Sequence, residues 1–412
     1  MWIYIYKTDK HRRFDKCKAR LVVRGDQQAH VLSEETYAST LAGRSFRALI
    51  AIAARFDLRL IQYDAVNAFV NAPLDTDVFI RMPPGYRRPG TILKLQKALY
   101  RLRISPLLWQ KELSTTLKAL GCEPVPHKPC CYTLNRVLLF FYVDDIVLAY
   151  KPEERNTAYG LINQLKSKYK LTGGGNLQWF LGIEIIRDLK TRRIWLSQAS
   201  YIEKITNLAE TVTPDQTPMS AEELLPSDGR AHFSEINRFQ RKIGSLLYVA
   251  VISRPDIAFT VSRLTHFLTN PSAAHQRAAD QVLRYLYRTR GYALRFGGED
   301  DFIVASNASF ANNTLDQKSS QTYIIKLFSR LIGWRASKQT TVTTSTTEAE
   351  LLALAQAAKK AIYVRRLLKE LSVQLDEQSI RIQYNNQQTI KLVTKEAAQL
   401  KTQLRHVDIH NH

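Results

Sequence analysis

The sequence predicts an α+β fold divided into two or three domains. Short β-rich runs alternate with stretches of helical periodicity along the 412 residues, and a hydrophobic content of 45% suffices for more than one core. The apolar rhythm breaks between residues 211 and 229, where Thr, Pro, Ser, Asp and Glu predominate, and changes again after Gly297 and Gly298. We therefore expect domains at residues 1–212, 213–298 and 299–412.

Local composition and periodicity predict the elements of each domain. Runs of β-branched and aromatic residues predict strands at 19–23, 58–63 and 78–82, and apolar spacing predicts helices at 46–54 and 106–120. Residues 273–288 form a predicted amphipathic helix on which Arg277, Arg284 and Arg288 are available to face phosphates. Strands at 302–305 and 322–328, a helix at about 346–371 and a strand at 380–384 suit a compact α/β domain.

The charge balance indicates a polyanionic partner. Lys and Arg number 59 against 37 Asp and Glu, a net charge of +22 that attracts nucleic acid, although a generic basic surface remains an alternative. The four cysteines lack the paired spacing of a zinc or dithiol site, which fits a reduced intracellular protein. No apolar run is long enough to suggest a membrane span, and either end of the sequence can be a truncation.

Three acidic residues at strand ends carry the chemical argument. Asp144 and Asp145 interrupt two apolar β-forming runs and predict a hairpin with carboxylates at its tip, and Asp64 ends the strand predicted at 58–63. Carboxylates brought together on adjacent strands suit hard divalent cations and two-metal phosphoryl transfer. Taken singly, the pair also fits a simple polar turn, and Asp64 also fits a surface acid or cap.

Seven short motifs follow one another along the chain: KARLVVRG at 18–25, DAVNAF at 64–69, LYRL at 99–102, YVDD at 142–145, FLGIE at 180–184, GSLLY at 244–248 and SRPDI at 253–257. In this order they resemble the copia-type long-terminal-repeat retrotransposon polyprotein. The resemblance implies a right-hand polymerase fold, with fingers and palm in 1–212 and a thumb or connection in 213–298. An α/β ribonuclease H-like domain, degenerate in its motifs, would follow in 299–412.

The resemblance also implies roles for individual residues. Asp64, Asp144 and Asp145 would be the catalytic residues and the ligands of Mg²⁺ or Mn²⁺. The other implied positions are Tyr142 and Val143 beside the primer end, Leu181 and Gly182 in the turn that holds the primer, Lys18, Arg20 and Arg24 at the triphosphate, and Phe69 as the sugar-selecting aromatic. A solvated basic strand edge, an ordinary tight turn and a core phenylalanine remain structural alternatives for these positions.

The sequence departs from the family pattern at four positions. Arg101 and Ile104 stand where copia-type sequences usually have Gly and Gln, which places polymerase activity in question. Asn307 and Asn385 replace two aspartates expected in the ribonuclease H-like domain, where Glu348 and Asp408 remain. Two amides in place of carboxylates weaken Mg²⁺ binding. The spacing of Ser345 and Glu348 is also that of a helix capping box, which alone accounts for both residues.

The resemblance implies an RNA-directed DNA polymerase that transfers nucleotides by a two-metal mechanism. Its partners would be an RNA template, a DNA primer and product, deoxynucleoside triphosphates and other products of the polyprotein. It would act inside the cell, in a cytoplasmic virus-like particle or in the nucleus, without a membrane partner. One alternative is a non-catalytic relic that only binds nucleic acid, and another is a host-adopted basic scaffold.

Overall fold

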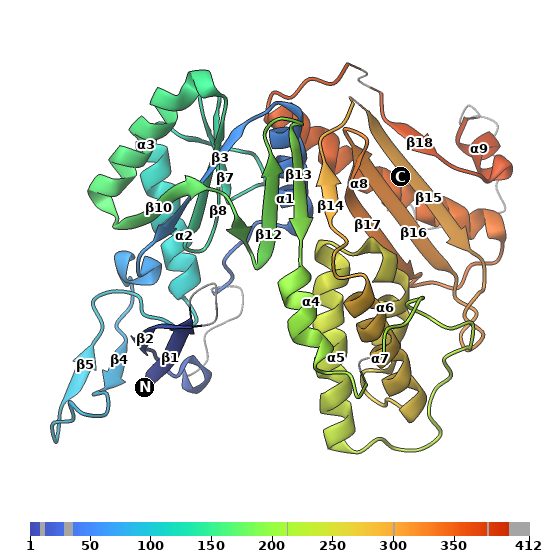
Figure 1. The fold of residues 1–412 in the computed structure, drawn as a ribbon, viewed down its shortest axis with the longest axis horizontal. Coiled ribbons are helices and arrows are strands. Elements are labelled where there is room, and N and C mark those ends of the chain that lie inside the picture. The colour runs from blue at the N-terminus through green and yellow to red at the C-terminus, as the bar shows by residue number, and fades with distance from the viewer. Residues whose placement is uncertain (9–12, 29–35, 212, 300, 377–378, 395–412) are drawn as a thin grey trace. The chain divides into compact units, whose positions relative to one another are not determined.

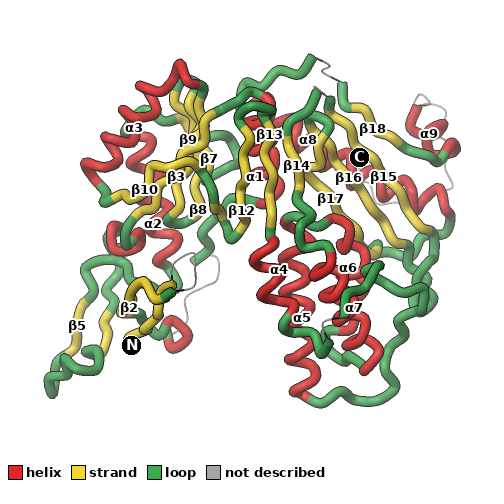
Figure 2. Tube along the Cα trace, in the orientation of Figure 1, coloured by secondary structure: helices red, strands yellow, loops and turns green. Residues whose placement is uncertain are grey.

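A computed structural model describes residues 1–8, 13–28, 36–211, 213–299, 301–376 and 379–394. Contacts group the chain into two compact units: the first contains Met1–Leu41 and Leu58–Leu177, and the second contains Ala42–Asp57 together with the chain from Gln178 onward. Helices and strands are interspersed throughout both units (Figures 1 and 2). The prediction of a mixed helix-and-strand fold is confirmed.

The first unit is built around a six-stranded antiparallel sheet. Its strand order is β10-β3-β9-β8-β7-β6, and in chain order the strands are β3 (Arg59–Ala65), β6 (Glu123–Pro124), β7 (Cys131–Leu134), β8 (Val137–Tyr142), β9 (Asp145–Tyr150) and β10 (Leu171–Asn176). Helices α2 (Ser105–Ala119) and α3 (Arg155–Lys168) pack against β6 and β9 respectively. Strands β8 and β9 are almost wholly apolar and buried, which makes them the centre of this core.

Two small hairpins complete the first unit. Strands β1 (Trp2–Thr8) and β2 (Phe14–Leu21) pair antiparallel, as do β4 (Phe79–Arg81) and β5 (Ile92–Lys94). The strand predicted at 19–23 therefore begins earlier and ends at Leu21.

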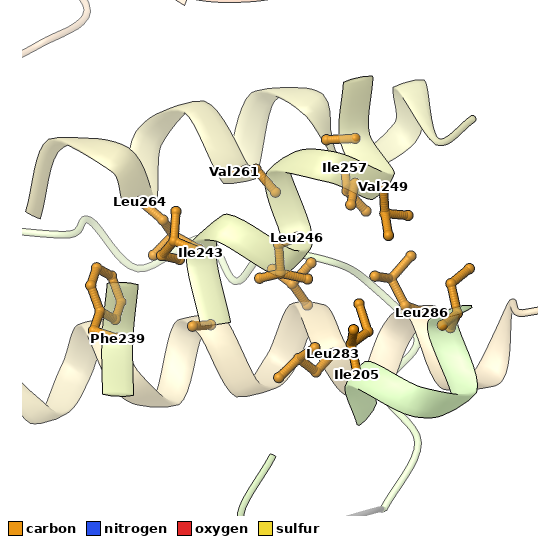
Figure 3. Packing of buried hydrophobic residues seen from close by; sticks show 14 of the residues in the cluster. Ile205, Phe239, Ile243, Leu246, Val249, Ile257, Val261, Leu264, Leu283 and Leu286 are labelled. Carbon is orange, nitrogen blue, oxygen red and sulfur yellow. The ribbon is translucent and has the colours of Figure 1, made fainter. Parts of the chain in front are cut away.

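The second unit begins with a four-stranded sheet, a helix and a helical cluster. The sheet has the order β11 (Trp179–Phe180), β12 (Ile183–Asp188), β13 (Arg193–Ser197) and β14 (Leu294–Phe296), and α1 (Gly43–Arg55) packs against β13 and β14. Helices α4 (Ala199–Thr206), α5 (Phe233–Ile252), α6 (Ala258–Leu264) and α7 (Ala273–Arg288) form the cluster. Their apolar faces meet in one core, in which Phe239, Leu246 and Leu283 are fully buried (Figure 3).

A third sheet lies in the C-terminal part of the second unit. Its order is β17 (Arg330–Lys338), β16 (Ser320–Leu327), β15 (Phe302–Ser309) and β18 (Arg381–Gln383), and β15 and β18 run parallel. The long helix α8 (Thr346–Glu370) packs on β15 and β16, and α9 (Gln387–Thr394) follows β18 (Figure 1). The periodicity of the sequence did not predict β17.

The segment predicted as a linker is irregular and contacts helix α7. Residues 211 and 213–229 form no helix or strand, as expected for a linker. Arg284, however, forms an ion pair of 2.7 Å with Asp215 of this segment. It therefore fastens the linker to α7, and the expectation that it is available to face phosphates is wrong. In the described part of the chain, no helix combines the length and the apolar character that a membrane crossing requires.

Candidate active site

Backbone pairing brings the three predicted aspartates to one edge of the six-stranded sheet. Asp64 at the end of β3 is the register partner of Asp145, the first residue of β9. Asp144 precedes Asp145, and its carbonyl accepts a hydrogen bond of 2.8 Å from the backbone N–H of Ala65. Residues directly opposite each other on antiparallel strands have Cβ atoms about 4.5–5.5 Å apart. The first acid therefore lies beside the other two, as the two-metal hypothesis requires.

Asp145 has a raised pKa in this setting. Burial raises the pKa of the half-buried Asp145 carboxyl, the charges of Asp144 and Asp64 raise it further, and a 2.7 Å hydrogen bond from Gln62 Nε2 partly opposes the shift. Burial also raises the pKa of Tyr100, with a contribution from the same two aspartates. Across the described residues, no three His, Cys, Asp or Glu side chains already lie close enough together to enclose a metal ion.

A strained turn displays Asp144. The turn between β8 and β9 contains only Val143 and Asp144, and Val143 has a φ of +54°. Such turns normally place Gly or Asn in the left-handed region, because a β-branched side chain is strained there by about 1–2 kcal/mol. The buried indole of Trp109 on α2 donates a 2.6 Å hydrogen bond to the Val143 carbonyl oxygen. Trp109, which sequence reasoning missed, thus holds the tip of the hairpin.

Some of the predicted nucleotide-binding residues gather beside this edge. The Arg20 guanidinium lies 5.1 Å from the centre of the Tyr100 ring, and this ring meets Phe69 edge-on at 5.0 Å. The charges of Asp64 and Asp144 contribute to the raised pKa of Tyr100. Arg20 and Phe69, which contact Tyr100, therefore lie near the aspartates. Lys18 is half-buried on β2, the strand that carries Arg20.

Arg24 has a different environment. Its guanidinium forms an exposed ion pair of 2.7 Å with Asp26, which raises the pKa of Arg24 through a hydrogen bond and charge attraction. The preceding residue, Val23, donates a backbone hydrogen bond of 3.0 Å to the Tyr100 carbonyl oxygen, so the Arg24 backbone follows directly on a residue bonded to Tyr100 while its side chain is paired with Asp26.

The predicted primer-positioning turn lies in the second unit. Leu181 and Gly182 connect β11 to β12 with φ values of +55° and +70°. The Tyr248 hydroxyl of α5 donates a hydrogen bond to the Leu181 carbonyl. As at Val143, an aromatic side chain on a helix holds a turn in which a bulky residue adopts a left-handed conformation. Tyr142 and Val143 lie in the first unit.

The departure at Arg101 has a backbone consequence. Arg101 has a φ of +66°, a conformation in which Gly is unstrained and Arg is not. Its carbonyl oxygen lies so close to Gly25 that a Cβ there would approach it to 2.1 Å. Ile104 is half-buried at the start of α2 and provides no side-chain cap. The glycine expected from the family pattern would therefore fit this backbone better than Arg101.

In the C-terminal sheet, Asn307 lies near the end of β15, and Asn385 follows the end of its parallel neighbour β18. Asn307 is exposed on β15, and Asn385 is exposed two residues after β18, the parallel neighbour of β15. The Glu348 carboxylate accepts hydrogen bonds from the backbone N–H and the hydroxyl of Thr344, at 2.7 and 2.9 Å, and Ser345 Oγ accepts one from the Glu348 N–H. Ser345 is therefore the N-cap of α8, as the capping pattern predicts, and the Glu348 carboxylate binds Thr344, the residue before the N-cap. Asp408 lies outside the described residues.

Glu350 is the acid that sequence reasoning missed in this region. Its carboxylate accepts a 2.9 Å hydrogen bond from the Ala308 backbone N–H, directly beside Asn307. Burial raises the pKa of Glu350, and the same carboxylate contributes to a raised pKa at Tyr384, next to Asn385. The only signal in the sequence was the i, i+2 spacing from Glu348, which does not tell which acid faces the sheet.

Comparison with known proteins shows which family the chain resembles. The family model described as reverse transcriptase (RNA-dependent DNA polymerase) matches residues 1–221. The retrovirus-related Pol polyprotein from transposon TNT 1-94 of Nicotiana tabacum is 29% identical over 100% of this chain and 32% of its own length. The corresponding polyprotein from transposon RE1 of Arabidopsis thaliana is 31% identical over 91% of this chain and 26% of its own length.

A shorter relative is similar in extent to this chain. The putative transposon Ty5-1 protein of Saccharomyces cerevisiae is 29% identical over 70% of this chain and 97% of its own length. The chain thus spans about a third or less of the two plant polyproteins. Because the family model covers more than half of the chain, the chain belongs to the reverse transcriptase family of copia-type retrotransposon polyproteins.

Proposed function

We propose that this chain catalyses RNA-directed DNA synthesis. The primer 3′-hydroxyl oxygen would bond to the α-phosphorus of a deoxynucleoside triphosphate, and the bond to the β-phosphate would break to release pyrophosphate. The observation that carries the proposal is the pairing of Asp64 with Asp145 beside Asp144. Residues 1–212 would supply fingers and palm, and 213–298 the thumb or connection. The enzyme would work inside the cell on an RNA template and DNA primer, together with other products of its polyprotein.

Mg²⁺ or Mn²⁺ is the cofactor that fits the aspartate edge. Carboxylate oxygens are the ligands these hard cations prefer. Burial raises the pKa of Asp145, and the charges of Asp144 and Asp64, which a cation would neutralise, raise it further. Asp64, Asp144 and Asp145 would hold the metal and move closer together as their repulsion is relieved. The chemistry supplied there is activation of the 3′-hydroxyl and stabilisation of the pyrophosphate leaving group.

Arg20, Tyr100 and Phe69 would bind the incoming nucleotide. Arg20 is oriented by the Tyr100 ring and can bind a triphosphate oxygen, and Phe69, braced by the same ring, can exclude a ribose 2′-hydroxyl by contact. Lys18 and Arg24 would assist at the triphosphate, which in the case of Arg24 requires release from Asp26.

Two turns would position the primer. Tyr142 and Val143 would contact its 3′ end, and Leu181 with Gly182 would support its backbone. An aromatic side chain on a helix donates a hydrogen bond to each turn and restrains it. This restraint supports the assignment, because catalytic groups need fixed geometry.

We propose that the ribonuclease H-like domain, residues 299–412, does not cleave RNA. Asn307 and Asn385 supply no negative charge, the Glu348 carboxylate is hydrogen-bonded to Thr344, and Glu350 is the carboxylate beside the altered centre. We expect no Mg²⁺-dependent cleavage of the RNA strand in an RNA–DNA hybrid. Cleavage by the unaltered chain would refute the assignment. Restoring Asp at positions 307 and 385 and finding activity that is lost again with Glu350→Gln would support it.

Primer extension on an RNA template tests the polymerase proposal. The chain should extend a DNA primer with Mg²⁺, and Asp144→Asn should lower kcat by about 100-fold or more, since the substitution removes a metal ligand without a change of size. Asp75→Asn, an exposed acid of the same unit, is the matched control and should leave kcat unchanged. Equal extension by Asp144→Asn and the unaltered chain would reject the proposal. If only a chain with Arg101→Gly and Ile104→Gln extends the primer, the relic interpretation holds.

A further inference from the structure

The second unit contains a cavity of about 840 Å³ that the proposed polymerase site does not use. Its walls come from the start of α1, from α5 and α6, from β17 and from α8. All of its lining residues belong to the second unit, whereas the three aspartates belong to the first. The volume lies within the range of about 300–1,000 Å³ that is typical of small-molecule sites.

The lining of this cavity is positively charged. Arg44, Arg47, Lys318, Arg335 and Lys360 line it, and no Asp or Glu of the described residues does. A further lining residue, Lys338, is neutralised by a 2.7 Å ion pair with an acid outside the lining. Burial lowers the pKa of Lys360, and so do the charges of Arg44 and Arg335. Cations gathered without a counter-charge repel one another, which is unfavourable unless an anion binds.

The floor of the cavity is rigid. The Arg47 side chain is buried and donates hydrogen bonds to the carbonyls of Ile332 and Val251, at 2.7 and 2.9 Å. Its guanidinium lies 4.2 Å from the centre of the Trp334 ring, and Trp334 Nε1 donates to Ala250. Burial, and secondarily the charge of Arg44, lower the pKa of Arg47 to about 9. Arg47 thus contributes a fixed charge and has most of its geometry set by the backbone.

Arg44, in the first turn of α1, retains a hydrogen-bond donor for a ligand. One of its terminal nitrogens donates to the Tyr323 hydroxyl at 2.9 Å, while its buried Nε has no hydrogen-bond partner in the part of the chain that the structure describes. A Cβ at Gly333 would lie 3.3 Å from this Nε, so the absence of a side chain there leaves room for the guanidinium. Ala42 starts the 13-residue helix α1 without a side-chain cap, and it also lines the cavity. The positive end of the helix dipole therefore adds to the charge of the arginines.

We propose that this cavity binds a phosphate-bearing anion of about nucleotide size. Guanidinium groups with free donors and an uncapped helix start are the groups that recognise phosphate oxygens. The Arg44 guanidinium carbon lies 6.0 Å from the centre of the Tyr323 ring and 5.9 Å from the centre of the Tyr363 ring. These rings offer surfaces for a planar group attached to the phosphate. The ligand is either a free polyphosphate compound or a phosphate of a nucleic acid end that inserts into the cavity.

Binding of inorganic pyrophosphate to the full chain in EDTA tests the proposal. EDTA removes divalent metals, so binding that depends on the aspartate edge is suppressed and the outcome is independent of polymerase activity. Isothermal titration should show that Arg335→Gln combined with Lys360→Gln weakens pyrophosphate binding by about tenfold or more. The matched control is Arg366→Gln combined with Lys369→Gln, which removes two exposed cations of α8 outside the cavity lining and should leave the affinity unchanged.

Thermal unfolding supplies a second measurement that separates ligand loss from misfolding. The cavity variant should melt at the same temperature as the unaltered chain or higher, because repulsion is relieved, and should lose the stabilisation that pyrophosphate gives the unaltered and control chains. A parallel titration with a 5′-phosphorylated oligonucleotide distinguishes the sources. If the cavity variant loses affinity for the oligonucleotide but not for pyrophosphate, the ligand is a nucleic acid end. Equal binding of both ligands by the cavity and control variants would overturn the proposal.

Discussion

Replacing Trp109 by Phe removes the hydrogen bond by which α2 holds the turn between β8 and β9. Trp109 is 1% exposed, and its indole N–H lies 2.6 Å from the Val143 carbonyl oxygen. A phenyl ring keeps most of the packing but has no donor. We expect the turn to lose its preference for the conformation that presents Asp144 beside Asp64.

The size of the effect follows from two opposed contributions. A hydrogen bond of this kind stabilises by about 1 kcal/mol net, and the left-handed conformation of Val143 costs about 1–2 kcal/mol. Losing the bond therefore shifts the equilibrium between the held and the relaxed turn toward the relaxed form. The shift is roughly fivefold for about 1 kcal/mol, since 1.4 kcal/mol corresponds to a factor of ten. If only the held turn is competent, kcat should fall by up to about fivefold. In a Val143→Gly background, where φ is unstrained, Trp109→Phe should cost less.

Single-turnover primer extension at saturating nucleotide measures this change. Leu113→Ala is the control. Leu113 is fully buried on α2, four residues after Trp109, but it does not hydrogen-bond to the turn between β8 and β9. It should lower the free energy of unfolding by roughly 2–5 kcal/mol, more than Trp109→Phe, yet leave kcat nearly unchanged under folding conditions. The reasoning is refuted if Trp109→Phe extends primers at the original rate, or if Leu113→Ala slows extension equally.

Three further sets of substitutions test charges and backbone strain in the fold. Asp145→Asn should abolish extension but raise the melting temperature at neutral pH. The raised pKa means that the ionised carboxylate destabilises the folded chain as pH rises above the usual Asp value of 3.8, so the gain should vanish in melts at lower pH. Arg101→Gly should raise the unfolding free energy by about 1 kcal/mol in denaturant titrations, whereas Arg101→Ala, which keeps the positive φ, should not. Lys242 and Asp280 form a buried 2.6 Å ion pair between α5 and α7, so Lys242→Met should cost about 3–5 kcal/mol, and adding Asp280→Leu should recover most of it; a small single-mutant cost would contradict this account.

The elements of the fold were more predictable from the sequence than their partners. The helix expected at 106–120 is α2 at Ser105–Ala119, and the helix expected at 273–288 is α7 with the same bounds. Apolar periodicity reports which face of an element is buried, and that signal is local. It does not report that α1, between two elements of the first unit in the chain, packs against β13, β14 and β17 of the second.

The candidate site shows the same division. The strand ends bearing Asp64 and the adjacent pair were evident from composition, but their register needed the structure, because sheet pairing is decided by contacts more than 80 positions apart in sequence. The arrangement of Tyr100 between Arg20 and Phe69 had no sequence signal beyond a family motif. Glu350 was overlooked because the capping pattern at Glu348 explained the nearest acid and left its neighbour unassigned.

Mn²⁺ binding, followed by electron paramagnetic resonance on the full chain with primer and template, tests most directly whether the three acids act as one centre. We predict that Asp64→Asn and Asp144→Asn each weaken Mn²⁺ binding by about tenfold or more, while Asp75→Asn binds like the unaltered chain. If Asp64→Asn retains the original affinity, the acid on β3 is not a ligand, and the two-metal account of this site is contradicted.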